Sequence, residues 1–224
     1  MTESIKLMKL DLMMTKKYWK EMLFAGAIIS VSILPNVPIL LNIIMFMFAN
    51  TLLGYPFMIQ EKDKMDKFYS IIAVTKKEIV RSKYLLTLFY MVIIGTALIL
   101  INLILYYVVK VEVDLRGALL LIGMGMLLYS GVAALQLPCY FKWGYSKSRM
   151  ITAILPILVG VGVPGVVLGG AKLLGKEQLL DIGRNMARFI SNQYNVLLIG
   201  MVIGIILCFY ISYKVSENIY LKNR

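Results

Sequence analysis

The chain has 224 residues, of which 60% are hydrophobic and only 16% are charged, and its mean hydropathy is +0.80. A soluble domain of this length would carry charge on about a quarter of its residues. Here the charged residues leave five long uncharged stretches, each with at least the roughly 20 residues that a helix needs to cross a bilayer. These stretches are 22–60, 84–109, 117–141, 150–171 and 189–213. The composition excludes a soluble enzyme, a nucleic-acid-binding domain and a disordered tail, and predicts an all-α polytopic membrane protein forming a single transmembrane domain over residues 1–224.

The formal net charge of +12 would indicate a nucleic-acid partner if the chain were soluble. In a membrane protein, lysines and arginines instead hold loops on the cytoplasmic side and next to anionic lipid. We therefore expect these charges to face the lipid bilayer and no nucleic acid.

Residues 1–21 have the pattern of an amphipathic helix that lies in the membrane interface. At about 100° per residue, five lysines fall within one arc, and apolar and aromatic side chains cover the other side. Asp11 is the exception on the apolar side. Such a helix lies flat, with rings and methionines toward the lipid and ammonium groups toward phosphates; a plain basic tail is the alternative. The residues assigned to this interfacial helix are Lys6, Lys9, Lys16, Lys17, Trp19 and Lys20.

The first uncharged stretch, 22–60, is too long for one helix and contains Pro35 and Pro38 near its middle. Proline removes a backbone donor and disfavours a helical conformation of the residue before it. We therefore expect a turn there, between a short first span at 22–34 and a second span at 37–59.

The other uncharged stretches supply one span each, which gives six spans in total. The later spans are expected at 84–109, 118–140, 151–171 and 196–213. With the N-terminus inside, the cytoplasmic segments hold 18 lysines and arginines and the outer segments hold 6. This asymmetry follows the positive-inside rule. Both termini are therefore expected in the cytoplasm.

The loop at 60–83 combines an apolar stripe with many charges. Met65, Phe68, Tyr69 and Ile72 recur at the spacing of one helical face, so a short helix would present them together. An exposed stripe of this kind favours a protein partner. The alternative is that the stripe rests on the lipid surface or on the protein's own loops.

A second helix is predicted to begin at the end of the same loop. Thr75 and Glu78 have the spacing of a capping box, in which each side chain bonds the other residue's backbone N–H. Val74 and Ile79 are placed for the hydrophobic staple that often accompanies it. This helix should run directly into the third span.

Between the fifth and sixth spans, residues 172–195 carry apolar side chains at helical spacing. We expect one or two amphipathic helices there that dip into the outer interface, and a loose solvated connection is the alternative.

Within the spans, the polar residues are uncharged and are assigned either to helix packing or to a transport pathway. Helix–helix hydrogen bonding is the more common use of such residues. The fifth span is rich in proline and glycine, and a broken helix is tolerated in membranes only where neighbours or a cavity satisfy the freed backbone groups. The residues in question are Asn50, Asn102, Gln136, Pro156, Pro164, Gly165 and Gly169.

The sequence offers no residues for catalysis or metal binding. It contains no histidine, which is the commonest general base and metal ligand. Gly170 to Lys176 resembles a phosphate-binding loop, but Glu177 stands where a serine or threonine would hold magnesium. No Asp or Glu lies in any expected span, which disfavours a proton-coupled carrier. We therefore expect a protein that is not itself an enzyme and binds no metal.

Taken together, this pattern resembles small bacterial permeases of the ABC-2 type, the membrane subunits of ABC exporters. The most specific stretch begins at Glu61, continues with Asp66-Lys67 and ends with Val74-Thr75-Lys76-Lys77-Glu78-Ile79-Val80-x-x-Lys83-Tyr84. It is similar to the family's acidic residue, Trp-Asp-Arg-like step and Leu-Pro-x-Ser-Arg-x-x-Ile-Val-x-x-Lys-Tyr run. The sequence departs from that pattern at Lys64-Met65, where tryptophan is common, and at Ala73-Val74-Thr75, which replaces Leu-Pro-Val.

The resemblance implies that residues 61–72 form a coupling helix that docks onto a separate cytoplasmic ABC ATPase. ATP and Mg would be bound by that ATPase and no cofactor by this chain. A second permease subunit, identical or different, would complete the transporter in the bacterial plasma membrane. The residues assigned to ATPase coupling are Glu61, Met65, Asp66, Lys67, Phe68, Tyr69, Ile72, Thr75 and Glu78.

Several functions fit this resemblance. The chain is similar to exporters of amphipathic peptide toxins of the phenol-soluble modulin kind, and this is the expected activity. A permease for bacteriocin self-protection or for lipid extrusion is the alternative within the class. From a different class, a membrane scaffold or sensor subunit without transport stays open.

Overall fold

The computed structural model describes residues 2–16, 38–63, 65, 69, 74–107, 115–174 and 192–222. All secondary structure in these ranges is helical, in agreement with the all-α prediction. The helices are α1 (Thr2–Thr15), α3 (Pro38–Lys62), α5 (Lys76–Tyr107), α6 (Leu115–Leu174) and α8 (Tyr194–Lys222). The expected first span at 22–34, and residues 175–191 of the outer segment, lie outside the described residues.

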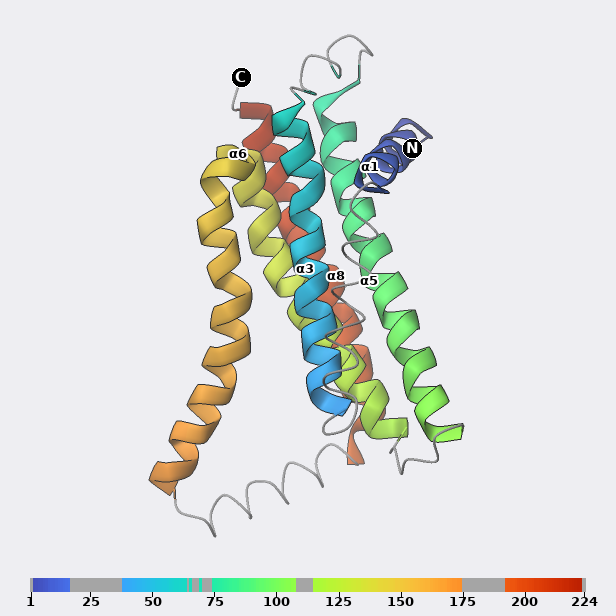
Figure 1. Cartoon of the computed structure of the whole chain (residues 1–224), viewed down its shortest axis with the longest axis vertical. Helices are drawn as coiled ribbons and strands as arrows, with labels where there is room; N and C mark the ends of the chain where they lie inside the picture. The colour runs from blue at the N-terminus through green and yellow to red at the C-terminus, as the bar shows by residue number, and fades with distance from the viewer. Residues whose placement is uncertain are drawn as a thin grey trace.

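The long helices run along the long axis of the molecule, and α1 lies beside them near the end that carries both chain termini (Figure 1). Within the described residues, three helical segments are long and apolar enough to cross a membrane. They are Lys76–Ile104, Arg116–Met150 and Tyr194–Lys222. The described part of the chain therefore has the character of a membrane-integral helical bundle.

Helix α6 reverses direction at Gly144, so that it forms two arms (Figure 1). Gly144 has φ 74° and ψ 176°, a combination that is open almost only to glycine. This turn lies between the expected spans at 118–140 and 151–171. The prolines and glycines of the expected fifth span, from Pro156 to Gly169, do not interrupt α6, which continues as a helix to Leu174.

The core of the bundle lies where α6 packs against both α3 and α8. Aromatic rings dominate it: Phe57 stacks on Tyr140 with ring centroids 4.9 Å apart and meets Phe141 edge-on at 5.3 Å. In a bilayer, helices associate through such close packing and through hydrogen bonds, because lipid tails are as apolar as the side chains themselves.

Helix α8 shows how the bundle divides into an inner and an outer face. Five of its six buried residues, Met201, Ile205, Phe209, Ser212 and Ser216, follow each other at three- and four-residue intervals, and Glu217 is the sixth. Other large apolar side chains of α8, such as Ile199, Ile206 and Ile211, are exposed, which suits a face in contact with hydrocarbon.

Candidate functional site

The candidate site is the end of the bundle where four parts of the chain meet: α1, the start of α5, the turn of α6 and the end of α8 (Figure 1). We call residues 61–83 the coupling segment; they comprise the last residues of α3, the connection and the first eight residues of α5. Within it, residues 64, 66–68 and 70–73 lie outside the described residues. The expected coupling residues Asp66, Lys67, Phe68 and Ile72 are among them.

The predicted start of α5 is confirmed. The carboxylate of Glu78 accepts hydrogen bonds from the backbone N–H of Thr75 at 3.0 Å and from its hydroxyl at 2.7 Å. In return the backbone N–H of Glu78 donates to Thr75 Oγ1 at 3.4 Å. Val74 and Ile79 pack in one apolar cluster, as the hydrophobic staple requires. The capping box therefore fixes the direction in which the coupling segment enters α5.

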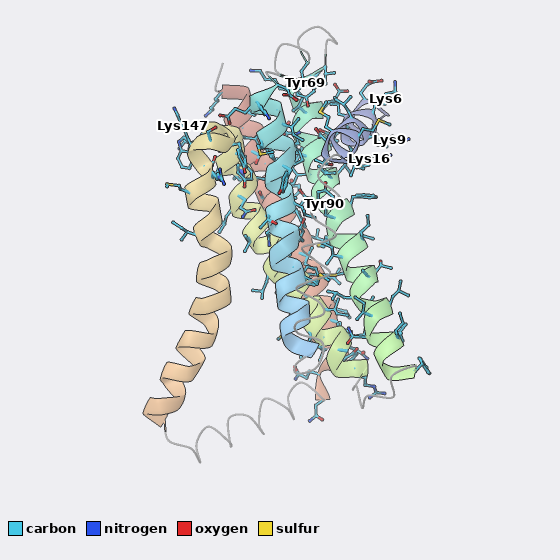
Figure 2. All side chains as sticks on the ribbon, viewed as in Figure 1. Lys6, Lys9, Lys16, Tyr69, Tyr90 and Lys147 are labelled. Atoms are coloured by element: carbon cyan, nitrogen blue, oxygen red, sulfur yellow. The ribbon has the colours of Figure 1, made fainter. Side chains whose placement is uncertain are left out.

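Tyr69 anchors the coupling segment to the bundle from inside. Only 5% of its surface is exposed, and it packs with Leu7 of α1 and Ile79 of α5. Met65 lies partly buried against the same cluster. In Figure 2 the labelled Tyr69 lies at the end of the bundle beside α5. This part of the predicted apolar stripe therefore rests on the protein's own helices, the alternative that the sequence left open.

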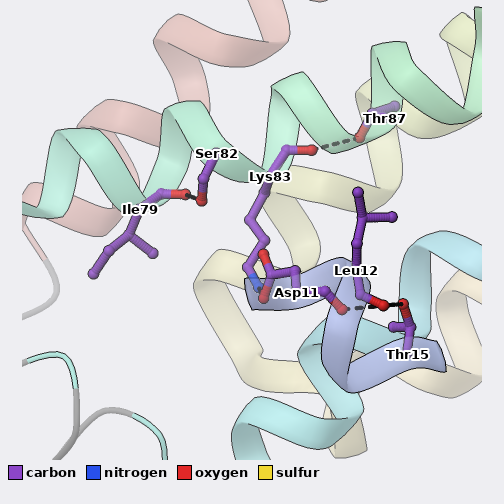
Figure 3. Close-up of polar contacts among 7 residues, drawn as sticks. All are labelled: Asp11, Leu12, Thr15, Ile79, Ser82, Lys83 and Thr87. Carbon is purple, nitrogen blue, oxygen red and sulfur yellow. Dashed lines mark hydrogen bonds and ion pairs between the residues drawn. The ribbon is translucent and has the colours of Figure 1, made fainter. Parts of the chain in front are cut away.

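Asp11, which broke the apolar side of the N-terminal helix, forms an ion pair with Lys83 of α5. Lys83 Nζ lies 2.9 Å from Asp11 Oδ1, and the two side chains are 1% and 3% exposed. Figure 3 shows the lysine side chain reaching from α5 to α1. The same ammonium group lies 5.2 Å from the ring centroid of Phe57 in α3. One buried contact thus joins α1, α3 and α5.

The orientation of α1 follows from this contact. Its buried residues are Ser4, Leu7, Asp11 and Thr15, which form one helical face against the bundle. Lys6, Lys9 and Lys16 are exposed (Figure 2). Lys17, Trp19 and Lys20 of the expected interfacial helix lie outside the described residues.

Glu61, at the end of α3, binds the turn of α6. Its Oε2 accepts a hydrogen bond of 2.9 Å from the backbone N–H of Ser146, and its Oε1 accepts one from the Ser146 hydroxyl. These hydrogen bonds lower the pKa of Glu61 below its ordinary value of 4.5. A carboxylate next to the first turn of a helix is also attracted by the positive end of the helix dipole. Glu61 therefore acts as a cap, supplied by α3, for the second arm of α6.

On the far side of the same end, Tyr84 links α5 to α8. Its hydroxyl lies 2.5 Å from Ser212 Oγ and 2.8 Å from Ser216 Oγ. Because Ser212 donates its own hydrogen to the carbonyl of Ala134 at 2.8 Å, Tyr84 donates to Ser212 and accepts from Ser216. Three helices, α5, α6 and α8, share this buried hydroxyl cluster.

A cavity of about 760 Å³ lies between the coupling segment and the turn of α6. Aromatic side chains, lysines and the carboxylate of Glu61 are among the groups that line it. The lining residues are Phe57, Gln60, Glu61, Tyr69, Val74, Lys76, Ile79, Tyr140, Phe141, Lys142, Trp143, Gly144, Tyr145, Ser146, Lys147 and Tyr220.

The polar residues of the spans, Asn50, Asn102 and Gln136, are buried and are not among the residues that line this cavity. Asn50 donates to the carbonyl of Phe46 at 3.1 Å, and Asn102 donates to the carbonyl of Leu98 at 2.8 Å. Each therefore bonds one turn back within its own helix rather than across to a neighbour. Gln136 is also buried, in the first arm of α6.

The sequence did not predict the partners of Glu61 and Tyr84. Gly144, Ser146, Ser212 and Ser216 carry no motif, and their roles appear only when distant helices meet. Asp11 did give a signal, because a lone carboxylate on an apolar helix face requires a buried partner.

A comparison with protein-family models matches residues 6–221 to a family described as ABC-2 family transporter protein. No curated protein and no solved structure matches the chain.

Proposed function

The chain belongs to the ABC-2 transporter family, and from this premise we propose that its coupling segment transmits work from a separate ATPase to the bundle. Members of this family are membrane permease subunits of ABC transporters that work with an ATPase partner. The proposal adds which part of this chain receives the ATPase and how its movement reaches the spans.

The attachment of the coupling segment to the bundle carries this proposal. At its beginning Glu61 holds the turn of α6, and in its middle Tyr69 packs on α1 and α5. At its end the Thr75–Glu78 cap leads into α5, where Lys83 binds Asp11. Because the coupling segment contacts the bundle at these three places, it cannot move independently of it. A displacement of the segment by the ATPase would therefore move α3, α5 and the turn of α6 together.

We further propose six spans with both termini in the cytoplasm. The turn of α6, the end of α8 and α1 lie at one end of the bundle, and α3, the first arm of α6 and α8 begin at the other (Figure 1). Because α1 and the start of α3 lie at opposite ends, an expected first crossing at 22–34 fits the connection between them. The lysine and arginine asymmetry favours the cytoplasm for the first end.

As the transported substrate we propose amphipathic or hydrophobic peptides of the toxin kind, moved outward through a pair of permease subunits. Support comes from the resemblance to compact peptide-toxin exporters. The described interior also favours an ATP-driven over a proton-driven cycle, because its deepest charges, Asp11 and Lys83, neutralise each other. Bacteriocin self-protection and lipid extrusion are the alternatives in the same class, and a scaffold or sensor subunit is the alternative outside it.

Co-purification with candidate ABC ATPases from the same genome tests the docking role. Phe68→Asp places a charge on the expected apolar stripe, and we expect it to reduce ATPase recovery at least about tenfold, the equivalent of about 1.4 kcal/mol. Leu221→Asp is the matched control, because Leu221 is an exposed apolar residue at the same end of the bundle. It should leave ATPase recovery unchanged.

Tyr69→Asp separates an internal anchor from a docking residue. Because Tyr69 is buried against α1 and α5, this variant should lower the melting temperature of the permease alone, whereas Phe68→Asp should not. Undiminished ATPase binding and ATPase stimulation by the Phe68→Asp variant would contradict the docking role.

A further inference from the structure

We propose that the cavity between the coupling segment and the turn of α6 binds the headgroup of an anionic phospholipid. Its volume of about 760 Å³ is within the range of small-molecule sites. The inference requires the membrane location of the family but not the docking of an ATPase, so it can fail or succeed independently of the function proposed above.

The charge of the cavity lining suits a phosphate group. Three lysines line it, Lys76 from the start of α5 and Lys142 and Lys147 from either side of the α6 turn. Glu61 is the one carboxylate among the described lining residues. Hydrogen bonds from Ser146 and the nearby Lys147 lower the pKa of Glu61, so it stays ionised, and the four charged lining residues together still carry a net positive charge that attracts an anion.

The rings of the cavity suit the glycerol and upper acyl chains that follow a lipid phosphate. Phe57, Tyr140 and Tyr145 form a stack, with successive ring centroids 4.9 Å and 6.0 Å apart. Lys142 Nζ lies 4.8 Å from the ring centroid of Trp143, which is 44% exposed. A free phosphate ion would make no favourable contact with these aromatic rings. An anionic lipid would contact the lysines with its phosphate and the rings with its apolar part.

The position of the cavity, at the ends of the candidate spans, also favours a lipid. Two candidate spans reach this end of the bundle, Lys76–Ile104 at its first residue and Arg116–Met150 near its last. The cavity is lined by Lys76 and by residues 140–147, so it lies where apolar helices end. Tryptophan, tyrosine and lysine at such a position are typical of the headgroup layer.

Quenching of Trp143 fluorescence by brominated lipids tests the proposal. The chain has two tryptophans, so Trp19→Phe leaves Trp143 as the single reporter. In nanodiscs, brominated phosphatidylglycerol should quench Trp143 more strongly than brominated phosphatidylcholine at the same mole fraction. Added to this background, Lys142→Gln with Lys147→Gln should lower the apparent affinity for phosphatidylglycerol by about 10- to 30-fold, given roughly 1 kcal/mol per basic residue.

The matched control is Lys62→Gln with Lys222→Gln. Both are exposed lysines of the same end that do not line the cavity, so the control removes the same charge and should keep the lipid preference. Excess inorganic phosphate should not reverse the quenching. Equal quenching by the two lipids, an unchanged preference in the Lys142/Lys147 variant, a loss equal to that of the control, or reversal by phosphate would overturn the assignment.

Native mass spectrometry of the same proteins gives a second measurement that does not depend on fluorescence. The reporter protein should retain one phosphatidylglycerol per chain in preference to phosphatidylcholine, and the Lys142/Lys147 variant should not. Similar melting temperatures of the variants would show that all are folded. Retention of phosphatidylglycerol by the folded Lys142/Lys147 variant would contradict the proposal.

Discussion

At the level of single residues, the Asp11–Lys83 pair fixes the position of α1 on the bundle. Removing two charges from water costs several kcal/mol for each ion, and their attraction offsets this only with good geometry. Here the contact is 2.9 Å, but Asp11 Oδ2 has no hydrogen-bond partner among the described residues. The pair therefore specifies one register of α1 against α5 rather than adding much net stability.

Breaking one side of this pair should be far more harmful than removing both. We expect Asp11→Leu to destabilise the protein by about 3–5 kcal/mol, because it leaves the Lys83 charge buried without a counter-charge. The double variant Asp11→Leu with Lys83→Met should recover most of that loss. Thermal unfolding in detergent measures both. The exposed Lys6–Glu3 pair is the control, and Lys6→Gln should cost less than about 1 kcal/mol. Equal losses in the single and double variants would argue against a buried pair.

At the level of elements, the start of α5 and the turn of α6 differ in how far the sequence could predict them. The start of α5 was predictable because a capping box and a hydrophobic staple are local patterns within six residues, Val74 to Ile79. A break between the expected spans at 118–140 and 151–171 was predictable from the charges of residues 142–149, but its position at Gly144 was not, because that glycine belongs to no local motif. The prolines of the fifth span do not interrupt α6, since membrane helices tolerate proline where neighbours satisfy the backbone.

Gly144 and Gly131 form a matched pair for testing the turn, since both belong to α6. Gly144→Ala should destabilise the protein by about 1–3 kcal/mol, because its φ of 74° is strained for an alanine. The new methyl group would also lie 3.3 Å from Glu61 Oε2. Gly131→Ala should be neutral or slightly stabilising, because nothing lies within 4 Å of its added Cβ and alanine favours a helix. Melting temperatures of the two variants in detergent check this, and equal values would contradict the assigned role of Gly144.

At the level of the whole molecule, hydropathy predicted an all-helical membrane protein but not which helices are neighbours. The sequence order does not reveal that α6 packs on both α3 and α8, or that α1 is tied to α5. Such contacts depend on side chains far apart in the chain, as Tyr84 with Ser212 and Ser216 illustrates. The candidate site was therefore predictable as a segment, residues 61–83, but its attachments at Glu61, Tyr69 and Lys83 were not.

The arrangement of the helix ends makes a prediction for the whole molecule in its membrane. Single cysteines introduced at Lys9 and Lys147 should react with a membrane-impermeant maleimide only after the cells are opened, because both positions belong to the end assigned to the cytoplasm (Figure 2). A cysteine at Asn195, at the start of α8 on the opposite end, should react in intact cells. The natural Cys139 and Cys208 are first changed to alanine, because both are free thiols. Labelling of Lys9→Cys in intact cells would place α1 and the coupling segment outside, where no cytoplasmic ATPase reaches them.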